Sequence, residues 1–314
     1  MISLFKSGRI SNQATIGFVS VLSAFALLAL ATAAAADPFR SVVGSAHDLS
    51  ASGGAVKGEA GQAQDQVCVY CHVPHNAVRR SSGASRAVQQ AAAFAASDDA
   101  PLWNRKNGAD RFSMYSVKNS ASFALTSGDT NDADRLVGPV SLGCLSCHDG
   151  QTAFNSLNQT PSIDSARGVS ASAYTFRLAS GRAVGNLAQA SAAGPGSANL
   201  GTDLRDDHPV SFTYDSALAA LKGKTLRDPA ASAATSGGGD LVIHRLGEAS
   251  AGGPNTIAAQ MLFARAAGGA PDQLECTSCH EPHMQGNPAD PGSNYPFLIK
   301  SNQRSRLCLT CHDK

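Results

Sequence analysis

Hydrophobic residues are unevenly spread along the chain, and one stretch near the beginning is continuously apolar. Residues 16–30 form this uncharged run, which follows Lys6 and Arg9 and precedes an alanine tract at 34–36. A positive segment, an apolar segment and a small-residue site in this order are typical of a secretory signal peptide, so we predict that residues 1–36 are removed. The alternative is an uncleaved anchor, because the charge-free stretch is long enough to span a bilayer.

Beyond this region the pattern is irregular, with short apolar clusters between tracts rich in alanine, serine and glycine. The tracts follow neither the helical nor the strand period, and we predict surface loops at 81–97, 179–199, 228–239 and 249–253. A helix is predicted over 215–222, and short strands are predicted over 211–214 and 241–243. Short helices are also expected around the cysteine motifs described below.

The composition argues against a large core made of side chains alone. Hydrophobic residues make up 43% of the chain, but many are alanines, and aromatic residues account for only 6%. Alanine buries little apolar area. The 25 Lys and Arg residues nearly balance the 24 Asp and Glu residues. The chain therefore lacks the charge excess that is typical of a nucleic-acid-binding protein.

All eight cysteines belong to four copies of Cys-x-x-Cys-His. We call them motif 1 (68–72), motif 2 (144–148), motif 3 (276–280) and motif 4 (308–312). This motif is the covalent attachment site of c-type haem, where the thiols bond to the porphyrin and the histidine ligates the iron. We therefore predict four covalently bound haem c groups. The predicted attachment residues are Cys68, Cys71, Cys144, Cys147, Cys276, Cys279, Cys308 and Cys311, and the proximal ligands are His72, His148, His280 and His312.

Three other uses of the cysteines explain the pattern less well. A zinc site needs paired motifs or spaced histidines, but it does not require a histidine directly after each second cysteine. A thioredoxin-like redox pair needs one motif beside a strand and a helix. A disulfide framework accepts eight cysteines but gives no reason for four identical spacings.

Four haems also predict the fold class. Their faces would supply the apolar surface that the side chains lack, and their thioethers and axial ligands would join distant segments. We predict a mostly irregular, haem-cored multihaem cytochrome with short α-helices and few short strands.

The sequences around the motifs indicate an internal duplication. Motifs 1 and 3 are both followed by Pro-His, and motifs 2 and 4 have the form Cys-Leu-x-Cys-His-Asp. Each half also contains a segment with proline and an aromatic residue between its motifs, at 101–104 and 295–298. We predict a first haem pair in 37–155 and a second in 156–314, within one haem-cored unit.

Five further histidines are available as sixth ligands: His47, His75, His208, His244 and His283. The predicted mature chain has only three methionines, too few for four irons, so ligation of every iron by two histidines is the simplest interpretation. His75 and His283 lie three residues after a proximal histidine, too near to reach around the same haem. We expect each to ligate the neighbouring haem of its pair, the alternative being a solvated loop histidine.

The remaining ligands are chosen from upstream histidines. His47 is the only one in the first half. In the second half His208, beside Asp206 and Asp207, is preferred because acidic neighbours orient an imidazole. The alternative for His208 is a pH-sensitive surface histidine. His244 is interpreted as structural, although it remains a candidate to replace His208 or His47.

The patterns around these motifs and around His47 and His208 resemble the doubled Cys-x-x-Cys-His, cytochrome c3-like group. Some members of this layout are extracellular tetrahaem cytochromes that polymerise into conductive filaments. The resemblance implies closely spaced haems, each with two histidine ligands, and a role in electron transfer. In filament-forming members an N-terminal histidine can ligate a haem of the next subunit, and His47 matches that position.

These observations predict an exported, periplasmic or extracellular electron carrier rather than an enzyme. Iron with six ligands has no position for a substrate. Its partners would be redox proteins, or further copies of itself in a head-to-tail polymer. The alternative is a multihaem reductase with one open haem site. A redox sensor is disfavoured because no signalling domain is visible.

Overall fold

A short helix or helical turn occurs at each of the four cysteine motifs, as the sequence predicted. The computed structural model describes residues 41–59, 66–73, 103–106, 112–116, 137–157, 175–191, 197–231, 256–264, 269–285 and 297–313. The predicted signal peptide, His75, His244 and the predicted strand at 241–243 lie outside these segments.

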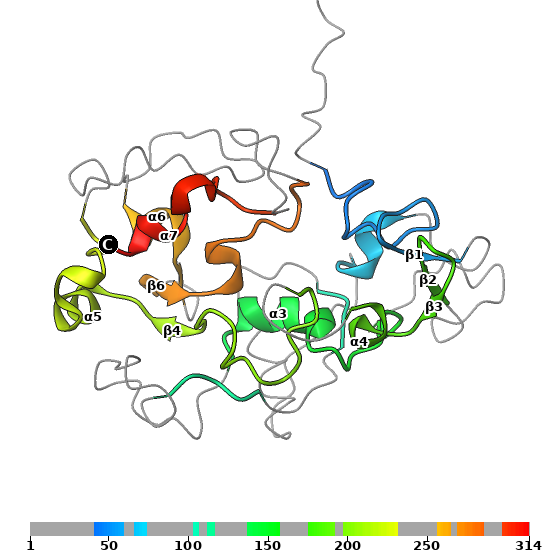
Figure 1. Cartoon of the computed structure of the whole chain (residues 1–314), viewed down its shortest axis with the longest axis horizontal. Coiled ribbons are helices and arrows are strands. Elements are labelled where there is room, and N and C mark those ends of the chain that lie inside the picture. Colours follow the sequence, from blue (N-terminus) through cyan, green and yellow to red (C-terminus); the bar gives the residue numbers. More distant parts are fainter. Residues whose placement is uncertain are drawn as a thin grey trace, which may run out of the picture. The chain divides into compact units, whose positions relative to one another are not determined.

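The four motifs each lie on a single helical turn or a short helix (Figure 1). These elements are η1 (Val67–Tyr70), α3 (Pro139–His148), η6 (Cys276–Ser278) and α7 (Cys308–Cys311). Residues three and four apart share one face of a helix. The Cys-x-x-Cys-His spacing therefore places both thiols and the imidazole on one side of a turn. The other helices are α4 (Leu187–Ala190), α5 (Ser216–Leu221), η4 (Gly223–Thr225), α6 (Ile257–Met261) and η7 (Gln303–Ser305).

The described strands form two small antiparallel sheets of three strands each. The first has the order β1 (Val56–Gly58), β2 (Phe176–Leu178) and β3 (Ala183–Val184). The second has the order β4 (Phe212–Thr213), β6 (Pro271–Leu274) and β5 (Phe263–Ala264). In the second sheet Phe212 is opposite Leu274, which leads directly into motif 3. That sheet therefore joins the segment after His208 to the third attachment motif.

Two local predictions are confirmed and one is wrong. The Asp215 carboxylate accepts a hydrogen bond from the Leu218 amide (2.8 Å) and begins α5, within the predicted helix at 215–222. Strand β4 lies within the predicted strand at 211–214. The tract at 179–199 was predicted as loop but contains β3 and α4. Pairing with β2 and the Asn186 side-chain cap stabilise these elements, which are too short to show a period.

The apolar core formed by the described residues is divided into three clusters. The largest combines β4, α5, α6, β6 and Ile299, with Tyr214, Leu218, Met261 and Leu274 among its buried members. A second packs Tyr70 and Phe154 with the first sheet, and a third packs Leu142 and Leu145 of α3 against neighbouring loops. The fold is thus mostly irregular, with few short helices and small sheets.

The residues Phe39–Lys314 cluster as one compact unit. Within it, β1 pairs with β2, although the two strands lie on opposite sides of the predicted boundary between 37–155 and 156–314. The division into two haem pairs remains a prediction. Among the described segments, none of the helices has the length and hydropathy needed to cross a membrane.

Candidate haem-binding site

The backbone gives three of the four motifs the same tight turn. The histidine amide donates to the carbonyl of the first cysteine in motif 1 (2.8 Å), motif 3 (3.1 Å) and motif 4 (2.9 Å). Motif 2 forms the last turns of α3. All eight cysteines are free thiols, so none is committed to a disulfide. The described residues include no group of three or more His, Cys, Asp or Glu side chains arranged to hold a metal ion directly, as a structural zinc site requires.

The duplication seen in the sequence extends to the way motifs 1 and 3 are held. His72 forms an isolated antiparallel β-bridge with Trp103, and His280 forms one with Leu298. Both bridging partners belong to the predicted proline and aromatic segments. Each segment therefore packs along the backbone of its attachment motif at an equivalent position.

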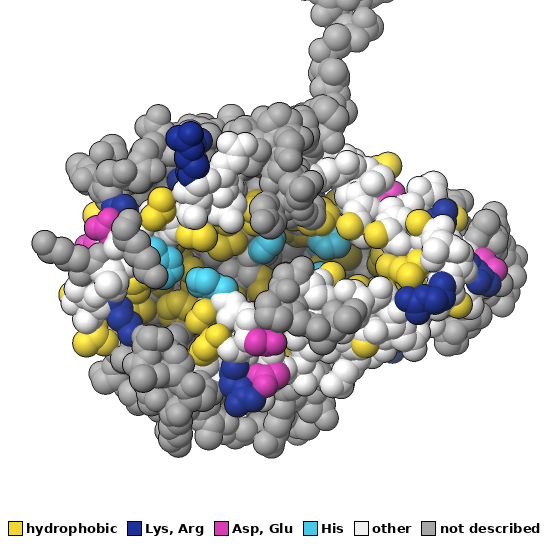
Figure 2. Space-filling model, viewed as in Figure 1, with side chains coloured by type: hydrophobic (Ala, Val, Ile, Leu, Met, Phe, Trp, Pro, Cys, Tyr) yellow, Lys and Arg dark blue, Asp and Glu magenta, His cyan; other side chains and the backbone are white. Residues whose placement is uncertain are grey.

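Three pairs of histidine rings lie at nearly the same separation. The ring centres are 6.1 Å apart for His47 and His148, 6.2 Å for His72 and His283, and 6.3 Å for His208 and His312. The angles between the ring planes are 83°, 19° and 75° in the same order. Each pair joins one proximal histidine to one predicted distal histidine. Figure 2 shows histidine side chains along one face, between hydrophobic side chains.

This separation tests whether the pairs fit one iron atom between them. A metal–imidazole bond is about 2.0 Å, and the ring centre lies about 1.2 Å behind the nitrogen, so two imidazoles across one metal have centres about 6.4 Å apart. Rings in direct contact are closer, as for His47 and Phe297, whose stacked centres are 4.3 Å apart. The three pairs therefore fit the axial positions of haem iron.

Hydrogen bonds at Nδ1 orient several of these rings. The acceptors are main-chain oxygens for three of them: Pro282 for His47 (3.3 Å), Ala198 for His148 (2.6 Å) and Pro209 for His208 (2.9 Å). His283 Nδ1 lies 2.7 Å from the Glu281 carboxylate. A partner at Nδ1 sets the tautomer and leaves Nε2 as the nitrogen available to a metal.

Desolvation favours the neutral form of three of the predicted ligand imidazoles. The pKa of His47 is lowered to about 4. Burial is the largest cause, and the charge of the neighbouring His148 is the next. Burial likewise lowers the pKa values of His148 and His280. Only a neutral imidazole binds a metal, so these shifts favour the ligating form at neutral pH.

The attachment thiols bring the motifs together in the order of the chain. The pKa of the Cys71 thiol is raised to about 12. Burial is the largest cause, and the next is the charge of Cys147 in motif 2. The thiols of Cys144 and Cys276 lie close enough to shift each other's pKa, upward at Cys144 and downward at Cys276, so motif 2 lies beside motif 3. At the other end, burial raises the pKa of Cys311 to about 12, and the next largest contribution is Cys279 of motif 3. Successive motifs are therefore neighbours in space.

A buried carboxylate holds motifs 2 and 3 against each other. Glu275 accepts hydrogen bonds from the hydroxyls of Ser141 in α3 and Ser211 (3.0 Å), and Ser141 accepts one from the Cys276 amide (3.0 Å). This contact was not predicted from the sequence, although a glutamate directly before a motif is a capping signal.

The burial of Arg105 and Lys300 was also not predicted, because nothing in the local sequence indicates that a single cation is buried.

The sequence interpretation expected His283 to face the neighbouring motif of its own half, but the structure places it beside His72 of the other half. The His47 ring lies beside His148 of motif 2, and the His208 ring lies beside His312 of motif 4. His75 and the alternative ligand His244 are outside the described residues.

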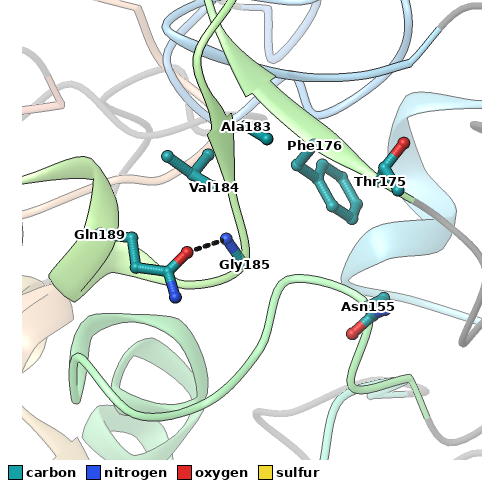
Figure 3. Close-up of a pocket in the computed structure, with 7 residues that line it drawn as sticks. All are labelled: Asn155, Thr175, Phe176, Ala183, Val184, Gly185 and Gln189. Atoms are coloured by element: carbon teal, nitrogen blue, oxygen red, sulfur yellow. Dashed lines mark hydrogen bonds between the residues drawn. The ribbon is translucent and has the colours of Figure 1, made fainter.

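A pocket beside the first sheet lies apart from the cysteine motifs. It is lined by residues of β2, β3 and the start of α4, including Phe176, Val184 and Gln189 (Figure 3). The Gln189 side chain accepts a hydrogen bond from the Gly185 amide (2.7 Å) across it. No member of a cysteine motif lines this pocket. It is therefore separate from the haem-binding residues.

The motifs, their order and the histidine pairs together define the class of a multihaem c-type cytochrome. The profile of the doubled CXXCH motif family matches residues 270–314, which contain motifs 3 and 4. This match supports the same class, whose general role is electron transfer and whose motifs imply covalently bound haem c. A search of the curated proteins found no match.

Proposed function

We propose that this protein is a tetrahaem c-type cytochrome that carries electrons along four haems, each with two histidine ligands, outside the cytoplasm. The observation that carries the proposal is the common separation of the three histidine pairs, 6.1 to 6.3 Å between ring centres. Haem bound at each motif supplies a one-electron redox centre.

The separations of the three pairs support a proposal for three sets of axial ligands. His72 and His283 serve motif 1, His47 and His148 serve motif 2, and His208 and His312 serve motif 4. The remaining proximal ligand is His280. We assign His75 as its partner, because His75 follows motif 1 at the position where His283 follows motif 3. Motifs 1 and 3 then exchange their sixth ligands.

The spatial order of the motifs supports a path with two ends. The attachment thiols influence one another's pKa from motif 1 to 2, from 2 to 3 and from 3 to 4, so successive motifs lie near each other. Electrons would enter near one terminal motif and leave near the other. Redox proteins are the proposed donors and acceptors.

A filament role would need a histidine that reaches another subunit. His47, the position that matches such a ligand, lies beside His148 of its own chain and stacks on Phe297. We therefore propose that a single chain is the functional unit and that His47 completes a haem site within it. Electron microscopy of the secreted protein tests this proposal, and filaments linked through His47 would contradict it.

The proposed function predicts four haems per chain, all low-spin. Mass spectrometry of the purified protein should show four covalent haem additions, and electron paramagnetic resonance of the oxidised protein should show no high-spin signal. Two classes of low-spin signal are expected, because one pair of rings is nearly parallel (19°) and two are nearly perpendicular (83° and 75°). A high-spin signal from one haem would instead favour a reductase with an open site.

The choice between His208 and His244 has its own test. His208→Ala should convert the haem at motif 4 to a five-coordinate, high-spin form, because the His208 and His312 ring centres are 6.3 Å apart. His244→Ala is the matched control and should leave all four haems low-spin. The reverse pattern in the optical and resonance spectra would transfer the ligand role to His244.

A further inference from the structure

Arg105 and Lys300 are buried cations at equivalent positions of the two halves. Their exposed fractions are only 2% and 7%. Each follows directly on a segment that is bound to the first motif of its half. Asn104 donates a backbone hydrogen bond to Cys71 (2.8 Å), and Ile299 donates one to Cys279 (3.0 Å). The two cations therefore occupy equivalent backbone positions relative to motifs 1 and 3.

Both cations reach the same place in the second motif of their half. The Arg105 guanidinium donates twice to the Ser146 carbonyl (3.2 and 3.1 Å), and Ser146 precedes Cys147. The Lys300 ammonium donates to the Thr310 hydroxyl (2.9 Å), and Thr310 precedes Cys311. Each cation thus bridges from one attachment motif to the next.

The described hydrogen-bond acceptors of both cations are neutral oxygens. Arg105 donates its other hydrogen bonds to the carbonyls of Phe154 (3.0 Å) and Ala153 (2.9 Å). Among the residues that the structure describes, neither Arg105 nor Lys300 forms an ion pair. A buried charge without an opposite partner is costly, and carbonyl dipoles offset that cost only in part.

Each cation is held beside an attachment cysteine through the residue that directly precedes it. Arg105 is bound to Ser146, the neighbour of Cys147, and Lys300 is bound to Thr310, the neighbour of Cys311. A positive charge fixed beside an attachment cysteine stabilises the electron that is added to a haem bound through that cysteine.

We propose that Arg105 and Lys300 are duplicated electrostatic elements that favour the reduced state of the haems at motifs 2 and 4. The inference rests on the proposed function, since it requires haem at those motifs. Each cation lies beside the second motif of its half, so the two halves receive the same bias. The bias makes these haems easier to reduce than they would be without the charge.

The test is a spectroelectrochemical titration of the full holoprotein, with Lys300 as the target because it has a single described side-chain contact. A unit charge about 10 Å away, at an effective dielectric constant of about 20, changes an equilibrium roughly tenfold. Lys300→Met and Lys300→Gln should each lower the midpoint potential of one haem by about 59 mV, the equivalent of tenfold for one electron. Lys300→Arg, which keeps the charge, should restore the potential.

Arg205→Gln is the control for net charge, because Arg205 is exposed and paired with Asp203 (2.5 Å). It should leave all four potentials unchanged. Unchanged potentials in both neutral Lys300 variants, or an equal shift in Lys300→Arg, would overturn the proposal. Failure of both neutral variants to bind four haems would assign Lys300 to assembly and also overturn it. A failure of the proposed function is distinct, because it would be visible in the haem count and spin state of the unmodified protein.

Discussion

Replacement of His47 by alanine should leave one of the four haems five-coordinate and high-spin. His47 is the proposed sixth ligand at motif 2, and its ring centre lies 6.1 Å from that of His148. Its ring stacks on Phe297 and its Nδ1 lies 3.3 Å from the Pro282 carbonyl oxygen. These contacts hold the ring in place, so no other side chain is expected to take over the position. Electron paramagnetic resonance and optical spectra of the oxidised holoprotein measure the change.

Two further measurements make this experiment specific. Added imidazole should restore the low-spin spectrum of His47→Ala, because it can occupy the space that the side chain leaves. His47→Met should remain six-coordinate but raise the potential of one haem, as methionine ligation does. An unchanged low-spin spectrum in His47→Ala without imidazole would show that His47 is not a ligand.

Replacement of Arg105 by methionine should produce the largest loss of stability among the described side chains. Arg105 donates four hydrogen bonds to the buried carbonyls of Ser146, Ala153 and Phe154. Methionine fills similar space but donates none, so these carbonyls would lose their side-chain donor. The free energy of unfolding should fall by about 1–3 kcal/mol, the cost of leaving buried acceptors without their donor. Denaturant unfolding of the holoprotein, followed by circular dichroism, gives this value.

Arg205→Met is the matched control, because the Arg205 side chain is exposed and its ion pair with Asp203 is on the surface. Exposed ion pairs contribute little to stability, so this variant should unfold at nearly the same denaturant concentration as the unmodified protein. Arg105→Lys should recover only part of the loss, because an ammonium cannot reproduce the guanidinium fork. If Arg105→Met and Arg205→Met unfolded at the same denaturant concentration, the hydrogen bonds of Arg105 would not stabilise the fold.

Several features of the fold were predictable because their causes are local. Asp215 caps α5 through the amide of a residue three positions later, and alternating side chains mark β4. The β-bridges that tie Trp103 to His72 and Leu298 to His280 were not predictable. They depend on backbone pairing between segments far apart in the chain, which leaves no period in either one. The short elements β3 and α4 were missed because they are too short to show a period.

The candidate site divides in a similar way. The attachment cysteines, their proximal histidines and the choice of His47 and His208 as ligand candidates all came from the motifs and their neighbours. The partner of His283 did not, because proximity along the chain favoured its own half, whereas packing placed it beside His72. The burial of Arg105 and Lys300 was also not predictable, because it depends on packing by distant segments and not on the neighbouring sequence.

What the sequence by itself determined is the attachment chemistry. Two cysteines and a histidine spaced within five residues share one helical turn, so the motif and its geometry are local and need no tertiary contact. The tertiary structure alone decided which histidines face each other, in what order the motifs lie, and where buried charge acts on them. Those features depend on closing long stretches of chain around a common centre. Packing and hydrogen bonds between distant segments offset the entropic cost of that closure. A local sequence pattern does not predict these contacts.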